Sequence, residues 1–356
     1  MQESLAFGDS FSRAMTLRFF LIVFGLLLAC GGSPRAAAQS SSAPSLIVGS
    51  ILPLTGSSAA FGIASKRGIL MALDDLSPTD RARVKVIFED DGLKNNRSIT
   101  AAQKLITIDK VDALITWSSG TALAVGSLSE ARGIPQLAIA SDPAIGREHR
   151  YSFTYWPSPE TETKTLYDYL KKHGKRRIAM VTQVNSFPLA MRDAFASNVK
   201  RDNVLEIIAD EEIGGDATDV RSSLLKVKSK GQADAVIVAS FPGQLALIVK
   251  QLRELGITAP LFGYETFEDK ASFDAAAGLF TGAIYSTGAD ARPDFVERFA
   301  KKYPGDTYYT ASHSYDSLKL LVDATRQQKD GASIARFLRT LRNYPTISGI
   351  ISATGD

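Results

Sequence analysis

Hydrophobic residues after the first 45 positions fall into two alternating patterns. Short runs rich in β-branched and aromatic residues predict strands, whereas apolar residues spaced three and four apart predict helices. The predicted strands cover Leu46–Ile51, Val84–Phe88, Ala113–Thr116, Gln136–Ala140, Arg177–Thr182, Ala233–Ser240, Pro260–Tyr264 and Gly282–Ser286. The predicted helices cover Ser65–Leu76, Ile99–Asp109, Ala122–Arg132, Thr161–His173, Leu189–Lys200, Ser222–Lys230, Gln244–Leu255, Asp294–Lys302 and Ser312–Gln328. This alternation predicts an α/β fold with buried parallel sheets and a site at the strand ends.

Two interruptions of the pattern predict a division into two lobes. The first lies at residues 155–159, where two prolines precede a fresh β/α series, and the second at Thr287–Pro293. A length of 356 residues also favours about two domains. We therefore predict a discontinuous lobe 1 formed by residues 44–157 plus 288–350, and a lobe 2 formed by residues 158–287.

The first 38 residues predict an export signal. Arg13 and Arg18 lie close to an apolar run, residues 19–29, that is too short to span a bilayer. A Leu-Leu-Ala-Cys sequence ending at Cys30 resembles a lipoprotein box, while an Ala-Ala-Ala sequence before Gln39 fits ordinary signal cleavage. Both remain open. We expect a periplasmic protein, soluble or lipid-anchored through Cys30, without an intramolecular disulfide because Cys30 is the only cysteine.

Charge and motifs exclude several classes of function. The 41 basic and 38 acidic residues show no long run of one sign, so we expect no nucleic-acid partner. The chain lacks the common nucleophile, zinc and phosphate-binding motifs, so we expect no enzyme, cofactor or metal. The three histidines, His149, His173 and His313, are interpreted as surface or helix-end residues. The acidic sequence at 89–92 suits a loop cap better than a cation site.

Several short motifs carry a family resemblance. They are Gly49-Ser-Ile-Leu-Pro-Leu-Thr-Gly56 followed by Ala60-Phe61-Gly62, Thr116-Trp-Ser-Ser-Gly120, Gly133-Ile-Pro135, Ala140-Ser-Asp-Pro143 and Phe262-Gly-Tyr-Glu265. In order and spacing the chain resembles, from Leu46 onward, the leucine/isoleucine/valine-type periplasmic binding proteins. The resemblance implies the type I periplasmic binding fold, or Venus flytrap, in which a hinge joins two Rossmann-like lobes. It also implies a monomer, and lobe 2 strands beyond Asp356, so that lobe 2 lacks its C-terminal part here.

The resemblance places an anion site at the turn after the Ala113–Thr116 strand. In the family this turn and the next strand end hold the α-carboxylate of an amino acid, which by position implicates Ser119, Ala140 and Ser141. A helix N-terminus at such a turn also favours an anion. Ser118 and Ser119 are not separated by the pattern, although Ser119 is preferred. The plainer interpretation is a serine that only caps the helix.

The resemblance also assigns an ammonium site and a side-chain pocket. Glu265 follows the Pro260–Tyr264 strand, where amino-acid binders of the family carry an acidic group for the ligand ammonium. Phe61, Trp117, Phe187 and Phe241 fall where the family lines its side-chain pocket, although Phe187 replaces a tyrosine of many relatives. Aromatic residues at strand ends also commonly belong to the core.

These assignments imply a binding protein of an ABC importer that closes around an amino acid with an apolar side chain. Its partners would be that small molecule and a membrane permease. A sensor of amides or aromatic acids has the same outline and is the first alternative. A hydrolase acting through Glu265 and Asp269 is a second, but no nucleophile and base occur at a recognisable spacing.

Overall fold

The computed structural model describes residues 46–326 and 328–354, which belong to one compact unit. The predicted export signal, including Cys30 and Gln39, lies outside the described residues. Within the described part, no helix is both long and apolar enough to cross a membrane.

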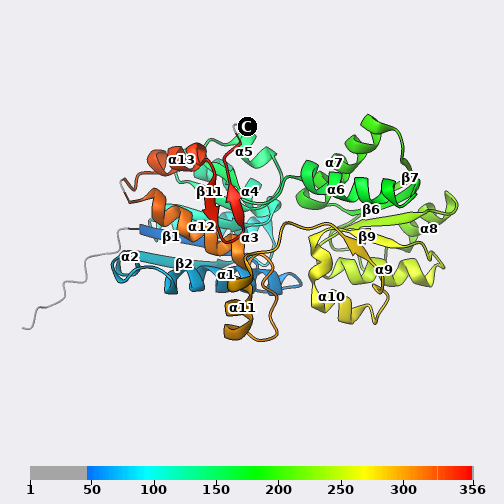
Figure 1. Ribbon diagram of the computed structural model, residues 1–356, viewed down its shortest axis with the longest axis horizontal. Coiled ribbons are helices and arrows are strands. Elements are labelled where there is room, and N and C mark those ends of the chain that lie inside the picture. The colour runs from blue at the N-terminus through cyan, green and yellow to red at the C-terminus, as the bar shows by residue number, and fades with distance from the viewer. Residues whose placement is uncertain (1–45, 327, 355–356) are drawn as a thin grey trace, which may run out of the picture. The chain divides into compact units, whose positions relative to one another are not determined.

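The first sheet has five parallel strands in the order β2-β1-β3-β4-β5. They are β1 (Leu46–Leu52), β2 (Val84–Asp90), β3 (Ala113–Trp117), β4 (Gln136–Ile139) and β5 (Ser152–Thr154). Alternate side chains point to opposite faces, so each face has its own helical cover. One face packs on α1 (Ala59–Asp74) and α12 (Ala311–Ala324), and the other on α3 (Asn95–Thr107) and α4 (Ser119–Arg132) (Figure 1). The short helices α2 (Pro78–Arg83) and α5 (Ala144–Glu148) complete this part.

The second sheet is also five-stranded and parallel, in the order β10-β9-β8-β6-β7. Its strands are β6 (Arg177–Gln183), β7 (Glu206–Ile213), β8 (Ala235–Ala239), β9 (Leu261–Gly263) and β10 (Ile284–Tyr285). Helices α6 (Pro159–Lys172) and α7 (Ser186–Asp202) pack on one face, with α8 (Arg221–Ser229) and α9 (Gln244–Glu254) on the other (Figure 1). The 3₁₀ helix η1 (Glu265–Glu268) and α10 (Lys270–Ala275) follow β9, and α11 (Pro293–Lys302) follows β10.

The predicted α/β class with two parallel sheets is confirmed. The pattern missed β5, which is only three residues long, and β7, in which acidic residues dilute the apolar alternation of an edge strand. It also missed α13 (Gly331–Thr340) and the antiparallel hairpin of β11 (Tyr344–Thr346) and β12 (Gly349–Ile351). The division into lobe 1 (residues 44–157 plus 288–350) and lobe 2 (residues 158–287) stays a prediction.

Helix α12 is fixed by a buried aspartate in its middle. The carboxylate of Asp316 accepts hydrogen bonds from the backbone N–H groups of Ile347 and Ser348, both at 3.0 Å, and from the Tyr155 hydroxyl at 3.0 Å. These bonds join the helix to the turn between β11 and β12 and to the segment after β5. They therefore hold the start of α12, and with it Tyr309 and Thr310, in a defined place.

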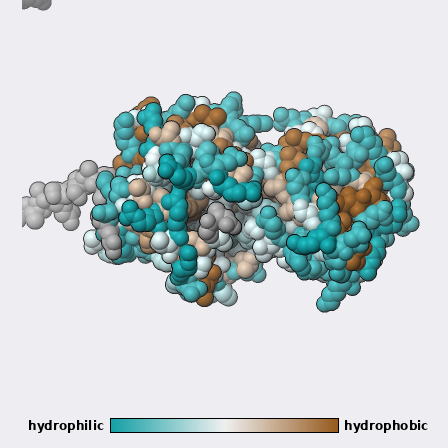
Figure 2. Space-filling model, turned by 90° about the horizontal axis from the view of Figure 1, so that it is seen from above, coloured by the Kyte–Doolittle hydropathy of each residue, from teal (hydrophilic) through white to brown (hydrophobic). Residues whose placement is uncertain are grey.

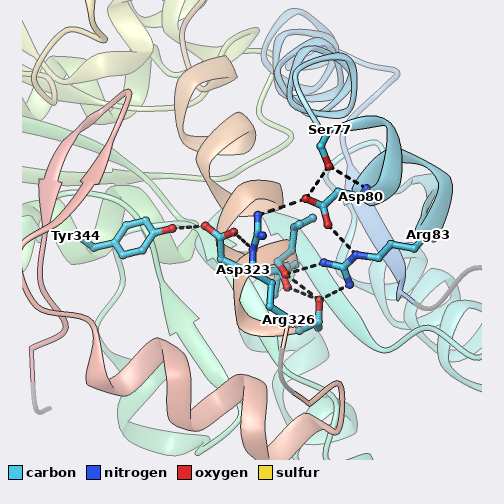
Figure 3. Close-up of polar contacts among 9 residues, drawn as sticks. Ser77, Asp80, Arg83, Asp323, Arg326 and Tyr344 are labelled. Atoms are coloured by element: carbon cyan, nitrogen blue, oxygen red, sulfur yellow. Dashed lines mark hydrogen bonds and ion pairs between the residues drawn. The ribbon is translucent and has the colours of Figure 1, made fainter.

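A polar network fixes the other end of α12. Figure 3 shows its labelled side chains, Ser77, Asp80, Arg83, Asp323, Arg326 and Tyr344. The Arg83 guanidinium donates to Asp80 at 2.9 Å and to the Val322 carbonyl at 3.3 Å, and Arg326 also donates to Asp80, at 3.3 Å. Tyr344 donates to Asp323, so β11 joins the same network. The hydrogen bond from Arg83 is the main cause of the lowered pKa of Asp80.

The exposed surface is mainly hydrophilic on the face drawn in Figure 2, where hydrophobic side chains gather in limited patches. Among residues 46–326 and 328–354, the exposed large hydrophobic residues are Ile63, Ile99, Ile108, Val184, Leu225, Phe273, Tyr285 and Ile350. Some exposed hydrophobic surface of this kind is usual for globular proteins.

Gly68 lets α1 and α12 approach closely, so a larger residue there should destabilise the fold. A Cβ at Gly68 would overlap the backbone carbonyl of Ala311. We expect Gly68→Ala to lower the free energy of unfolding by about 1–3 kcal/mol, because the two helix backbones must separate. Urea unfolding measures this, with Gly214→Ala as the control, since nothing lies within 4 Å of a Cβ there. Equal stability of the two variants would contradict the close helix contact.

Candidate functional site

One cavity collects the residues that follow the strands of both sheets. All nine predicted ligand-binding residues line it: Phe61, Trp117, Ser118, Ser119, Ala140, Ser141, Phe187, Phe241 and Glu265. Five further lining residues were not predicted: Ile139, Trp156, Thr266, Tyr309 and Thr310. The cavity volume is about 30 Å³, which is room for about two water molecules. A larger ligand therefore requires the site to widen.

The first turn of α4 forms one wall of the cavity. Ser118 caps this helix, and its hydroxyl accepts a hydrogen bond from the Thr121 N–H at 3.2 Å. The Ser119 hydroxyl accepts one from the Asp142 N–H at 3.3 Å, whereas the buried Ser141 hydroxyl has no partner. Because the first N–H groups of a helix lack intrahelical acceptors, this wall offers donors to an anion.

Ser118 has an unusual backbone conformation, with φ at +80°. Residues with a Cβ rarely adopt this region, and such strain is concentrated at functional sites. The cap bond to Thr121 offsets part of the cost. The Ser118 hydroxyl is therefore already committed to the helix, which is consistent with the preference for Ser119 as the ligand residue; that preference stays a prediction.

Aromatic side chains form a continuous series around the cavity. In order of contact they are Trp156, Tyr309, Phe61, Trp117, Phe241 and Phe187. Successive ring centroids are 5.3, 4.9, 5.9, 6.0 and 5.6 Å apart. These distances are typical of tilted and edge-to-face aromatic pairs. The site thus offers an apolar enclosure with few polar groups, as small-molecule sites commonly do.

Glu265 supplies a carboxylate to the same cavity. It begins η1 and is only 4% exposed, and its Oε2 atom has no hydrogen-bond partner within residues 46–326 and 328–354. The indole N–H of Trp156 and the hydroxyl of Thr266, which also line the cavity, are buried without a partner of full hydrogen-bond geometry among the described residues, although Trp156 lies near enough to Glu265 to act on its pKa. Burial is the main cause of the raised pKa of Glu265. Buried polar groups normally have partners, so a ligand is a direct explanation for this set.

Glu162, which the sequence analysis missed, lies beside Glu265. It is 3% exposed, and neither carboxyl oxygen has a partner with full hydrogen-bond geometry, although the two carboxyl groups are close enough to interact. Burial, and then the charge of Glu265, raise the pKa of Glu162 well above its usual value. One signal could have revealed it: Glu162 falls in the apolar stripe of α6, four residues before Leu166 and eight before Leu170.

The surroundings of this carboxyl pair carry no compensating cation. Among residues 46–326 and 328–354, no lysine, arginine or histidine forms an ion pair with Glu162 or Glu265. Burial raises the pKa of Tyr309 well above its usual value, and it raises that of Glu268 to about 7. The groups nearest the pair are therefore neutral or acidic.

One histidine departs from its prediction. His313 was expected at the surface or at a helix end; it does lie in the first turn of α12, but it is buried. Its ring centroid is 4.3 Å from that of Trp156 and 5.3 Å from that of Tyr155. Burial lowers its pKa to about 3, so the imidazole is neutral near pH 7 and does not compensate the carboxyl pair.

The remaining acidic candidates cap local structure. Asp90 accepts the N–H groups of Leu54 at 2.8 Å and Gly92 at 2.9 Å, and Asp269 caps α10 by accepting the Ser272 N–H at 2.7 Å. In the part of the chain that the structure covers, no group of three or more His, Cys, Asp or Glu residues is arranged to hold a metal ion.

Comparison with known sequences points in one direction. A family model described as periplasmic binding protein matches residues 45–356. The Leu/Ile/Val-binding protein homolog 8 of Brucella abortus is 27% identical over 282 residues, covering 72% of this chain and 69% of the relative. Leu/Ile/Val-binding protein homolog 3 of Brucella melitensis is 24% identical over 328 residues, covering 87% of this chain and 88% of the relative.

Solved structures share the fold. The leucine-binding protein LivK of Thermotoga maritima aligns with a TM-score of 0.79 at 21% identity, covering 86% of this chain and 91% of that one. LivJ of Streptococcus pneumoniae, solved with isoleucine, aligns with a TM-score of 0.77 at 22% identity, again covering 86% of this chain and 91% of that one. A solute-binding protein of Rhodopseudomonas palustris, solved with 3,4-dihydroxybenzoic acid, aligns with a TM-score of 0.73 at 20% identity, covering 87% of this chain and 89% of that one.

The buried carboxyl pair predicts an unusual pH dependence of stability. Between about pH 4.3, where an unfolded glutamate loses its proton, and the raised pKa of the folded pair, the folded protein holds the extra proton. Its free energy of unfolding should therefore fall as pH rises through this window. Glu162→Gln should reduce the fall, because the variant has one fewer buried acid. Urea unfolding of ligand-free protein at pH 5 and about pH 8 measures the difference.

Glu160→Gln is the matched control, since Glu160 lies on the same helix but is exposed. Equal pH dependence in the parent and in Glu162→Gln would show that Glu162 is solvated.

Proposed function

Because the chain belongs to the periplasmic binding protein family, we propose that it is the extracytoplasmic substrate-binding protein of an ABC importer. We further propose that its ligand is an amino acid with an apolar side chain, as in the branched-chain amino-acid relatives. In this role Ser119, Ala140 and Ser141 receive the ligand carboxylate, and Glu265 receives the ammonium group.

One observation carries the amino-acid assignment. The same cavity holds a helix start rich in N–H donors and a buried carboxylate without a cation. A zwitterion supplies an anion for the first and a cation for the second. A buried charge left unpaired is costly, so both groups favour a ligand that carries both charges.

The aromatic series fits the rest of such a ligand. Phe61 follows β1 and Trp117 ends β3 of the first sheet, whereas Phe187 and Phe241 belong to segments that follow strands of the second. An aliphatic or aromatic side chain enclosed by these rings is removed from water, which stabilises the complex. Since the described cavity is small, we propose that the ligand enters an open form and that hinge closure completes the site.

The alternatives require different ligand chemistry. A receptor for aromatic acids is the first, because one structural neighbour was solved with 3,4-dihydroxybenzoic acid. Such a ligand lacks an ammonium group and leaves Glu265 unpaired. For a hydrolase, Asp269 would have to act with Glu265, but its carboxylate is engaged in capping α10 and does not line the cavity.

Removal of the Glu265 charge tests the ammonium site. We expect Glu265→Gln to weaken L-leucine binding by about 10- to 100-fold, because charge-assisted hydrogen bonds contribute roughly 1.5–3 kcal/mol. Ser119→Ala should weaken leucine binding by a smaller factor, since the backbone N–H groups of α4 remain. Isothermal titration calorimetry measures both, with the exposed Glu297→Gln as the control. Unchanged leucine binding by Glu265→Gln would remove the ammonium assignment.

A deaminated analogue separates the amino-acid and carboxylic-acid functions. Isocaproate keeps the carboxylate and side chain of leucine but lacks its ammonium group. We expect it to bind the parent protein more weakly than leucine and to be much less sensitive to Glu265→Gln, because no charge pair is lost. The reverse order, with isocaproate or an aromatic acid bound more tightly than any apolar amino acid, would favour the aromatic-acid receptor.

A further inference from the structure

Glu162 has no part in the proposed contacts to the ligand, yet its position is unusual. It does not line the cavity, but it lies behind Glu265, which does. It is only 3% exposed, and both carboxyl oxygens lack a partner with full hydrogen-bond geometry among the described residues. Two carboxylates in mutual contact repel each other strongly when both are ionised. One of them must therefore stay protonated, or a cation must join them.

The described surroundings provide no other means of neutralising the pair. From η1 and the residue before it, the neighbours are Glu268 and Tyr264; from the segment before α12, Tyr309; and from α12, His313 next to Trp156. These groups are acidic, or neutral near pH 7. Glu162 lies in the first turn of α6, where the helix dipole favours an anion, but this effect is smaller than the cost of burying a second charge.

We propose that Glu162 and Glu265 share one proton in the empty site, and that the ammonium group of the ligand displaces this proton into solvent. Glu162 thereby becomes a selectivity residue that acts through Glu265 and makes binding depend on pH. The inference rests on the proposed function, because it requires a ligand with an ammonium group.

The charge balance favours this exchange. In the empty site the pair carries one negative charge and one acidic O–H bond. On binding, that O–H bond breaks, its proton leaves to the buffer, and the ligand ammonium brings one positive charge next to two carboxylates. The carboxyl pair together with the ammonium group carries one negative charge after the exchange, as the pair alone does before it, and the ligand carboxylate is placed at the N–H donors of α4 rather than at the pair. A ligand without a cationic group would leave the proton in place.

Calorimetry in buffers of different ionisation enthalpy measures the displaced proton. With L-leucine at about pH 6, the parent protein should release up to one proton per ligand, and its affinity should rise with pH by as much as about tenfold per unit. Glu162→Gln should still bind leucine, because the amide donates to an ionised Glu265. This variant should release far fewer protons per bound leucine than the parent. Glu160→Gln should behave as the parent does.

Two results overturn the proposal. One is leucine binding by the parent without proton release, and the other is equal release by Glu162→Gln. In either case the amino-acid function survives, since leucine still binds. If no apolar amino acid binds, the proposed function fails instead.

A measurement without ligand keeps the two failures distinct. Infrared difference spectroscopy of the empty parent protein at neutral pH should show a protonated-carboxyl band that is lost in Glu162→Gln and kept in Glu160→Gln. The same spectrum in both variants would overturn the shared proton, whatever the ligand proves to be.

Discussion

The carboxyl ends of parallel strands must meet along one edge of a sheet, and the candidate site depends on this constraint. Trp117 ends β3, Ala140 follows β4, and Glu265 is the second residue after β9. Residues far apart in the sequence therefore line one cavity without any local contact between them. Apolar side chains on both faces of each sheet hold the strands in register and so fix these positions.

Electrostatics then give the cavity wall two chemically different parts. The start of α4 presents N–H donors, and Glu265, with Glu162 beside it, presents a carboxyl group that forms no ion pair among the described residues. Burial strengthens both effects, because water no longer screens them. A site of this kind is stable only when protonated or occupied, which links its chemistry to the ligand it is proposed to bind.

Much of this arrangement could be predicted from the sequence, because long apolar runs such as Ala235–Ala239 identify central strands directly. The nine candidate residues came from the family resemblance, and the cavity brings all of them together. Tyr309 could not be found in this way: it precedes α12, and tertiary contacts with Phe61 and Trp156 place it in the site. Glu162 lies in the helical stripe of α6 but was not singled out, since its partner Glu265 is more than 100 residues away in the sequence.

The proposed function requires one zwitterion to reach both the start of α4 and Glu265. A crystal structure of the protein bound to L-leucine tests this requirement. We expect the ligand ammonium within hydrogen-bond distance of Glu265 and the ligand carboxylate at Ser119 and Ser141, with the side chain against the aromatic series. A leucine bound in the opposite orientation, or outside this cavity, would contradict it.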